Sequence, residues 1–147
     1  MSEMRVAKGV YEKIRAHGEE TYPHECCGAL IGKPTADGWS VTGAVRAGNA
    51  RTDSAHNRYS IAPIELIRIE RQARQQQSEI AGFYHSHPDY PAQWSPTDFA
   101  EAHWLGCLYV ITAVAKGRAE VTNAFLLTGK NEDEKRFDPA TIAVTEE

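Results

Sequence analysis

The stretch Ile80-Ala81-Gly82-Phe83-Tyr84-His85-Ser86-His87-Pro88 combines a short apolar run with two histidines two positions apart. The apolar part, 80–84, predicts a β-strand that leads directly into His85. In a strand, residues two apart point to the same side, so His85 and His87 can both bring a ring nitrogen to about 2.0 to 2.1 Å from one zinc ion. Ser86 faces the other way. The alternative is a pair of polar loop histidines, and the two interpretations are balanced until Asp98 is considered.

The next segment, Ser95-Pro96-Thr97-Asp98, fits two different roles. It is a standard helix start, with Ser95 as N-cap, Pro96 at the first helical position and Asp98 at the third, and this predicts an Asp98 side chain turned toward its own backbone amides. As a ligand, the same carboxylate turns toward the histidines and leaves Ser95 free for a reacting carbonyl. The nearby histidines favour the ligand role. The metal motif then lies partly at the end of a strand and partly in the loop that follows.

Two neutral imidazoles and one carboxylate fill three positions of a tetrahedral zinc ion and leave the fourth open for water, as in catalytic rather than structural sites. We therefore expect one Zn²⁺ per chain, which would lower the pKa of that water to about 7. A general base is still required, and Glu25, at the start of the apolar run 26–31, is the candidate. The alternative for Glu25 is a surface carboxylate beside Pro23, which its position in the sequence alone would favour.

Composition limits the classes of protein to consider. A chain of 147 residues with 41% hydrophobic and 24% charged residues fits one globular domain spanning 1–147. The formal charge of -4 provides no basic face, so neither nucleic acid nor an acidic membrane surface is an expected partner. The first eight residues lack the apolar region of a signal peptide, and no apolar run approaches the roughly 20 residues of a spanning helix. A cytoplasmic location is the default expectation.

Three cysteines, Cys26, Cys27 and Cys107, make an odd count, and adjacent cysteines rarely bridge each other. We expect buried, reduced thiols rather than a disulfide scaffold. Metal binding by the adjacent pair is the alternative, although the CxxC spacing of a structural zinc site is missing.

Hydrophobic periodicity and turn residues predict the other elements. In chain order they are an opening helix from Val6 to Gly18, strands 26–31 and 39–45, a loop 47–60, a helix 63–77, a helix 95–104, a hairpin of 108–115 with 120–127, and a partly ordered tail 133–147 with one short strand. The opening helix should cover one face of a sheet.

The complete pattern is Glu25, then His-Ser-His-Pro, then seven residues between His87 and Ser95, then Ser-x-x-Asp. It resembles the JAMM, or MPN+, metallopeptidase family from about Val6 to Leu127. The resemblance implies an α/β (α+β) fold, a mixed β-sheet flanked by helices and similar to cytidine deaminases. The deaminase signature itself, HxE with PCxxC, is absent, so base deamination is not supported. The resemblance also implies Glu25 as acid and base, and Ser95 as a partner of the tetrahedral oxyanion.

Members of this family cut after a diglycine tail. The segment Tyr22-Pro23-His24-Glu25-Cys26-Cys27-Gly28 looks most like compact bacterial members that process ubiquitin-like, β-grasp sulfur carrier proteins. Those members trim the carrier's C-terminus or release cysteine from a carrier adduct, a step of cysteine biosynthesis. Two alternatives remain open: an isopeptidase for ubiquitin-like conjugates, and a non-catalytic MPN scaffold. A homodimer through a helix face is conceivable.

Weaker predictions concern residues around the motif. His24 should point to the opposite side of a strand from Glu25, which favours a structural over a functional role, and the helical residues His17 and His103 receive no role. The loop His56-Asn57-Arg58 either binds an extended carrier tail or is merely solvated. Three aromatic residues should wall the cleft or pack the third helix: Tyr90, Trp94 and Phe99.

Overall fold

The computed structural model describes residues 2–49 and 59–146, which form seven strands, three α-helices and one short 3-10 helix. In chain order these elements are β1 (Ser2–Ala7), α1 (Lys8–Thr21), β2 (Cys27–Thr35), β3 (Gly38–Ala47), α2 (Pro63–Gln75), β4 (Glu79–Pro88), α3 (Pro96–Ala100), β5 (Leu108–Ala115), β6 (Arg118–Thr128), the 3-10 helix Glu132–Glu134 and β7 (Arg136–Thr145).

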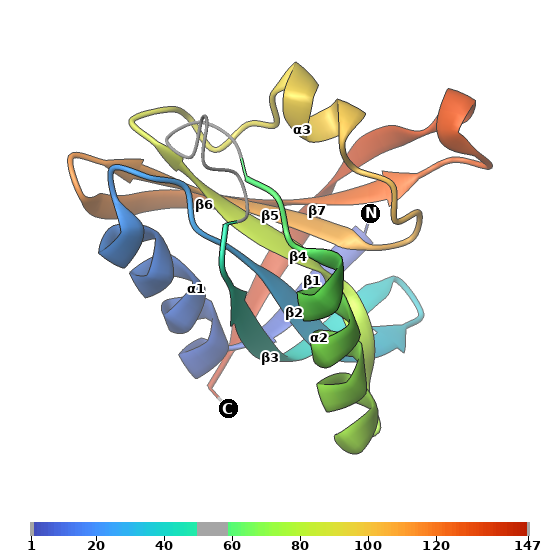
Figure 1. Cartoon of the computed structure of the whole chain (residues 1–147). Coiled ribbons are helices and arrows are strands. Elements are labelled where there is room, and N and C mark those ends of the chain that lie inside the picture. Colours follow the sequence, from blue (N-terminus) through green and yellow to red (C-terminus); the bar gives the residue numbers. More distant parts are fainter. Residues whose placement is uncertain (1, 50–58, 147) are drawn as a thin grey trace.

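The strands form one mixed sheet in the order β1-β3-β2-β4-β5-β6-β7, and β7 pairs in parallel with β1, which closes the sheet into a barrel (Figure 1). Pairing is also parallel between β1 and β3 and between β4 and β5, and antiparallel between the other neighbours. The predicted mixed sheet with flanking helices is confirmed. Closure of the sheet was not predicted, and the likeness to cytidine deaminases stays a prediction.

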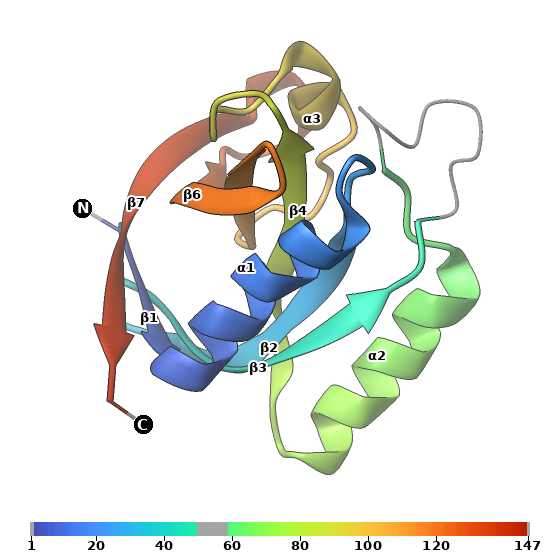
Figure 2. The same cartoon turned by 90° about the vertical axis from the view of Figure 1, so that its left-hand side faces the viewer.

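Helices α1 and α2 lie on opposite faces of this sheet. Figure 2 shows α1 within the curve of the sheet and α2 on its outer side. Side chains of β1, β2, β4 and β5 pack against α1 on the inner side, among them Val6, Leu30, Tyr84 and Val110. The outer side is covered by α2 and includes Ala29, Ile31, Ile69, Phe83 and Tyr109. Alternate residues of β4 therefore face different environments.

The chain begins with a strand where a helix was predicted from Val6 onward. In β1, Met4 and Val6 are buried and Arg5 between them is exposed, which is the period of a strand. Val6 also fits the helical spacing of Val10 and Ile14, so its apolar character alone does not distinguish a strand from the start of a helix. Parallel pairing with β3 and β7 decides for the strand, and α1 begins at Lys8.

The strand predicted in the C-terminal segment is confirmed, but the predictions that it is short and that the segment is only partly ordered are wrong. Residues Arg136–Thr145 form the ten-residue strand β7, held between β6 and β1. Phe137 packs against Phe99, Tyr109 and Phe125, with ring centroids 5.4 to 5.9 Å apart. These partners are distant in sequence, so the local pattern does not reveal them.

Other predicted elements are confirmed with changed ends. Helix α2 carries the expected ion pair, with 3.9 Å between Arg74 and Glu70. The β5–β6 hairpin turns at Lys116 and Gly117, whose φ angles of 52° and 86° are those of a tight two-residue turn. Strand β4 continues to Pro88 because β5 pairs with it from Gly82 to Pro88. Helix α3 ends at Ala100, well before the predicted end at residue 104.

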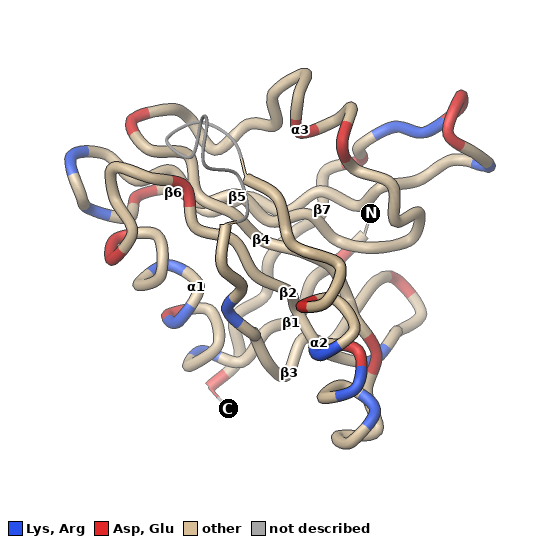
Figure 3. The backbone as a smooth tube through the Cα atoms, viewed as in Figure 1, with Lys and Arg blue, Asp and Glu red and all other residues tan. Residues whose placement is uncertain are grey.

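The remaining compositional expectations concern charge, thiols and membrane spans. Figure 3 shows Lys and Arg interspersed with Asp and Glu along α1, α2 and the turn before β7. Cys26, Cys27 and Cys107 are free and buried, as predicted. Among the described residues, every helix is too short or too polar to cross a membrane.

Candidate metal centre

His85 and His87 lie on the outer face of β4, the face that α2 and α3 cover. They share this face because they are two residues apart in a strand that pairs with β2 on one side and β5 on the other. Both imidazoles are buried, and their Nε2 atoms approach to 3.2 Å. The predicted placement of the two rings on one side of a strand is confirmed.

Asp98 reaches the same point from α3. Its Oδ1 lies 3.2 Å from His85 Nε2, and its Oδ2 lies 3.0 Å from His87 Nε2. Ligand atoms around a tetrahedral zinc ion with bonds of 2.0 to 2.1 Å are separated by about 3.3 Å. Two imidazole nitrogens and one carboxylate at these separations fit such an ion, and within the described chain they form the one group of this kind.

The segment that carries Asp98 is also a complete capping box. Ser95 Oγ accepts a hydrogen bond from Asp98 N at 3.0 Å, and Asp98 Oδ2 accepts one from Ser95 N at 3.0 Å. The prediction that capping and ligand geometry exclude each other is therefore wrong, because one carboxylate has enough lone pairs for both. The Ser95 hydroxyl is occupied as an acceptor, but its proton remains available to a further partner.

Contacts outside the ligand set hold the rings in place. His87 Nδ1 lies 2.8 Å from the carbonyl oxygen of Pro91 and must donate to it, which leaves Nε2 as the nitrogen with a free lone pair. Tyr59 stacks on His85, with ring centroids 4.4 Å apart and planes 23° apart. The sequence predicted neither contact: a backbone carbonyl has no sequence signal, and Tyr59 falls at the end of the predicted loop 47–60.

Glu25 lies beside these residues although it is far from them in sequence. Cys27 pairs with His85 across the β2–β4 ladder, and the same register places Glu25, two residues before β2, opposite His87. The side chain is 5% exposed, and its Oε1 has no hydrogen-bond partner among the described residues. The alternative of a surface carboxylate is therefore wrong. Its neighbour His24 is exposed, in a bend outside the strand where it was expected.

Burial and charge set the protonation of this group of residues. Burial raises the pKa of Glu25 to about 8, with Asp98 adding to the rise and His87 opposing it. Burial lowers the pKa of His85 and outweighs its hydrogen bond to Asp98. Burial also opposes ionisation of Asp98, but the hydrogen bonds to His85 and His87 outweigh it and lower the pKa of this carboxyl. The result is an ionised Asp98 beside a neutral His85, the forms that bind a metal.

A hollow of about 350 Å³ opens beside this group and is lined by Glu25, His87, Tyr90, Pro91, Gln93, Ser95 and Thr97. Tyr90 is 62% exposed at this hollow, whereas the rings of Trp94 and Phe99 pack on each other and on Phe137. The prediction that these aromatic residues wall the cleft or pack the third helix is confirmed. The predicted loop residues 56–58 lie outside the described residues.

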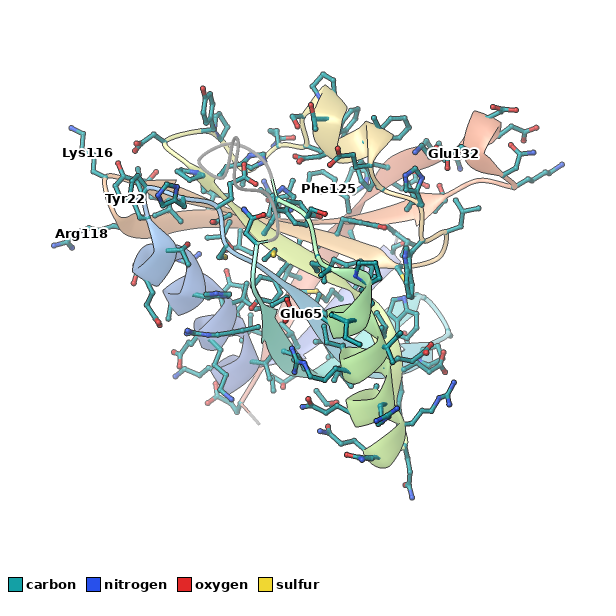
Figure 4. The ribbon with its side chains drawn as sticks, in the orientation of Figure 1. Tyr22, Glu65, Lys116, Arg118, Phe125 and Glu132 are labelled. Atoms are coloured by element: carbon teal, nitrogen blue, oxygen red, sulfur yellow. The ribbon has the colours of Figure 1, made fainter. Side chains whose placement is uncertain are left out.

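The segment before Glu25 is tied to the end of β4. Tyr22 Oη donates to Asp89 Oδ2 at 2.6 Å, and Lys116 N donates to Asp89 Oδ1 at 2.9 Å. Figure 4 shows Tyr22 beside Lys116 at the β5–β6 turn. The residue after β4 thus connects the end of α1 to the hairpin.

Residues 7–128 match the family Prok-JAB, described as prokaryotic homologs of the JAB domain. The chain is 31% identical over 114 residues to a desampylase of Haloferax volcanii, covering 75% of this chain and 80% of that protein. It is 29% identical over 99 residues to a probable TtuB-protein conjugate cleaving protease of Thermus thermophilus, covering 67% of this chain and 63% of that protein.

Two solved structures share the fold. A protein of Desulfitobacterium hafniense superimposes with a TM-score of 0.81 at 26% identity, covering 98% of this chain and 94% of that one. A protein of Salinibacter ruber superimposes with a TM-score of 0.70 at 33% identity, covering 95% of this chain and 91% of that one.

Proposed function

The chain belongs to the Prok-JAB family and is a JAMM-type hydrolase of peptide or isopeptide bonds, and on this premise we propose that it hydrolyses the bond after the C-terminal diglycine of a ubiquitin-like sulfur carrier protein. The observation that carries the proposal is the convergence of two imidazoles and one carboxylate beside a buried glutamate and a hollow. We also propose that residues 1–147 act as one domain in the cytoplasm.

His85, His87 and Asp98 would hold one Zn²⁺ ion through the two Nε2 atoms and the carboxylate. A bound zinc ion supplies Lewis acidity, which makes water a nucleophile near neutral pH and polarises a carbonyl. The hydrogen bond from His87 Nδ1 to the Pro91 carbonyl, and the Tyr59 ring on His85, keep the two imidazoles oriented for this purpose.

Glu25 is suited to move the proton. Its carboxyl lines the hollow, its Oε1 makes no other hydrogen bond among the described residues, and burial raises its pKa to about 8. A carboxylate with a raised pKa is a stronger base than an ordinary carboxylate, so it can accept a proton from the attacking water and pass it to the leaving amine. A buried carboxyl oxygen without a partner among the described residues is costly to the fold, which supports a catalytic role.

Ser95 is suited to steady the charge that develops on the scissile carbonyl. The oxygen of its hydroxyl group already accepts a hydrogen bond from Asp98 N. The hydroxyl proton is therefore available to a partner outside the helix. Ser95 lines the same hollow as Glu25. A donor placed where an oxyanion develops is worth several kcal/mol in the transition state, about 3 by typical mutagenesis.

The activities named for the two relatives, a desampylase and a probable TtuB-conjugate cleaving protease, support a substrate of the ubiquitin-like class. They also favour a second candidate, an isopeptidase that releases such a protein from a conjugate. The chemistry at the metal is the same for both, because only the identity of the leaving amine differs. Complete ligands in the described chain argue against the third alternative, a non-catalytic scaffold.

Intact mass spectrometry separates these candidates. Zinc-loaded protein is incubated with a sulfur carrier extended past its diglycine by cysteine or a short peptide, and with the same carrier linked to a lysine side chain. We expect a new mass ending at the second glycine, and no product with Glu25→Gln. Cleavage of the lysine-linked substrate alone would favour the isopeptidase. If neither substrate is cleaved although one zinc ion is bound per chain, the substrate assignment is wrong and the assignment of the metal centre is retained.

A further inference from the structure

Ser86 lies between the two histidines but faces the opposite side of the sheet. The alternation that directs His85 and His87 to the outer face of β4 directs the Ser86 side chain inward, toward α1. Ser86 is completely buried, with 0% of its surface exposed. A hydroxyl in such a place needs a specific partner.

The partner of Ser86 is the residue that follows Glu25. Ser86 Oγ accepts a hydrogen bond from Cys26 N at 2.9 Å, and Ser86 N donates to Cys26 O at 3.3 Å. Both polar groups of the Cys26 backbone are therefore bound to one residue of β4. The register fits this arrangement, because Cys26 lies opposite Ser86 when the β2–β4 ladder is continued past Cys27 and His85.

Helix α1 closes the space on the other side of Ser86. A Cβ atom added to Gly18 would lie 3.2 Å from Ser86 Cβ and 3.0 Å from Val114 Cγ2. Both distances are tighter than ordinary contacts between carbon atoms. Gly18 thus lets the helix pack directly on Ser86, which has no room to move away from the Cys26 amide.

The position of the Glu25 carboxyl depends on how the backbone on either side of it is held. Its Oε1 makes no hydrogen bond among the described residues, so the carboxyl is positioned mainly by its own backbone. That backbone is continuous with Cys26, and Cys26 is bound to the residue between the two histidines. Ser86 is therefore the residue of β4 that binds the backbone next to Glu25, beyond the ladder pair of Cys27 and His85.

We propose that Ser86 is a positioning residue for Glu25: by binding the Cys26 backbone it holds the general base at a fixed place relative to His85 and His87. The proposal rests on the proposed function, in which Glu25 moves the proton. Misplacement of a reacting group by about 1 Å can cost about 100-fold in rate. Loss of the Ser86 hydroxyl should therefore reduce turnover without removing a ligand or a substrate contact.

The test compares two variants with a matched control. Ser86→Ala removes the acceptor of the Cys26 amide, and Gly18→Ala displaces Ser86 without removing any polar group. We expect both to lower kcat about 10- to 100-fold, with KM changed by less than about 2-fold, and zinc content unchanged. Thr112→Val is the control: Thr112 is buried opposite Ser86 on β5 and bonds Thr122 at 2.9 Å, so the variant loses a similar hydrogen bond away from Glu25.

A second measurement does not depend on turnover. Crystal structures of wild type and Ser86→Ala should show a displaced Glu25 carboxyl in the variant, and the Cys26 amide should exchange faster with deuterium. A Ser86→Ala protein with an unmoved Glu25, a protected Cys26 amide or the kcat of Thr112→Val would overturn the proposal. If wild type cleaves no carrier substrate, the proposed function fails, whereas the Glu25 position and the amide exchange still decide the role of Ser86.

Discussion

Asp98 shows how a single side chain serves local structure and chemistry together. Its carboxylate completes the N-terminal cap of α3 and at the same time lies 3.0 to 3.2 Å from two imidazole nitrogens. The cap fixes the backbone at Asp98, and the side chain then has little freedom left to lose when it binds a metal. A ligand prepared in this way supports tight binding at low entropic cost.

An asparagine at this position separates the two roles. Asp98→Asn keeps an oxygen that can accept from Ser95 N but loses the charge, so zinc affinity should fall by more than about 100-fold. The helix cap is kept, but the charged hydrogen bonds to the imidazoles are lost, so the free energy of unfolding of the metal-free protein should fall by about 1.5 to 3 kcal/mol. Chelator competition and chemical denaturation measure the two quantities. An Asn variant that binds zinc as tightly as wild type would show that Asp98 is not a ligand.

The complementary change is Ser95→Ala. It removes the acceptor of Asp98 N, so the protein should lose about 1 kcal/mol of stability. Zinc stoichiometry should stay at one per chain because no ligand is touched, while kcat should fall about 100-fold if Ser95 binds the oxyanion. If the variant loses stability but keeps the wild-type kcat, Ser95 acts only as a helix cap.

Among the individual residues of the site, some were predictable from the sequence and others were not. The two histidines and Asp98 lie within one short segment, so the period of a strand and a helix start were enough to bring them together. Glu25 is adjacent only through the β2–β4 register, and the family resemblance pointed to it. The Tyr59 ring and the Pro91 carbonyl have no signal of their own, because neither a stacking partner nor a backbone acceptor requires a particular residue type.

Among the elements, α3 is too short to be stable alone and depends on its surroundings. The buried amine of Lys135, just before β7, donates to the carbonyl oxygens of Ala102 at 2.8 Å and Ala100 at 3.4 Å and lies over the Phe99 ring. Ala100 is the last residue of α3 and Ala102 lies two residues beyond it, so the cation is at the end of the helix that favours positive charge. The metal ligand on α3 is thus supported by a residue far along the chain.

We expect Lys135→Met to loosen α3. The variant leaves two carbonyls without their donor, so the free energy of unfolding should fall by about 1 to 3 kcal/mol, and zinc affinity should fall several-fold because Asp98 becomes less fixed. Lys130→Met, at an exposed lysine of the same turn, is the control and should change neither quantity. Equal behaviour of the two variants in thermal unfolding and zinc titration would contradict this role of Lys135.

The contact between α1 and β4 is predicted to make stability depend on pH. His17 Nδ1 lies 2.8 Å from Tyr84 Oη, and burial, with Arg46 nearby, lowers the pKa of His17 from 6.5 to about 4. The unfolded chain therefore binds a proton at a higher pH than the folded protein does. The contribution of neutral His17 to the free energy of unfolding is fully present above pH 6.5. It is lost as the pH falls toward 4, by up to about 3 kcal/mol.

Denaturation of His17→Gln at several pH values tests this dependence. The difference in unfolding free energy between pH 7 and pH 4.5 should be smaller in the variant than in wild type. His103→Gln changes an exposed histidine that pairs with Glu132, and should keep the wild-type dependence. A His17→Gln protein with the full pH dependence would place its origin elsewhere.

Whole elements were predictable where their pattern was local. Helix α2 and the β5–β6 hairpin carry a strong period and a Lys-Gly turn, and both lie close to their predicted bounds. The end of α3 was not predictable from residues 101–104, which suit a helix, because Gly106 with its φ of 88° and the hydrogen bonds from Lys135 direct the chain into β5. Tertiary contacts overrode local propensity there.

For the molecule as a whole, β7 is the element that completes the barrel. It supplies partners to both β6 and β1, and Phe137 joins the aromatic rings beneath α3. The region that matches the family ends at residue 128, before β7 begins. Parallel pairing between the first and last strands is the least local contact in the fold, which explains why sequence patterns left this segment as a tail.

A chain ending at residue 135 should therefore fail to fold. It exposes the edges of β1 and β6 and removes Phe137 from its neighbours, which is a loss of at least about 3 kcal/mol before any backbone hydrogen bond is counted. Solubility and size-exclusion chromatography measure the result. A truncated protein that is monomeric, cooperatively folded and still binds zinc would show that closure of the barrel is dispensable.

The proposed mechanism requires that His85, His87 and Asp98 hold one metal ion. X-ray diffraction from crystals of the zinc-loaded protein, recorded on both sides of the zinc absorption edge, tests this claim directly. We predict a single anomalous peak per chain, about 2.0 to 2.2 Å from the two Nε2 atoms and the Asp98 carboxylate. Absence of a peak there, or a peak at another group of residues, would contradict the assignment of the metal centre and the mechanism built on it.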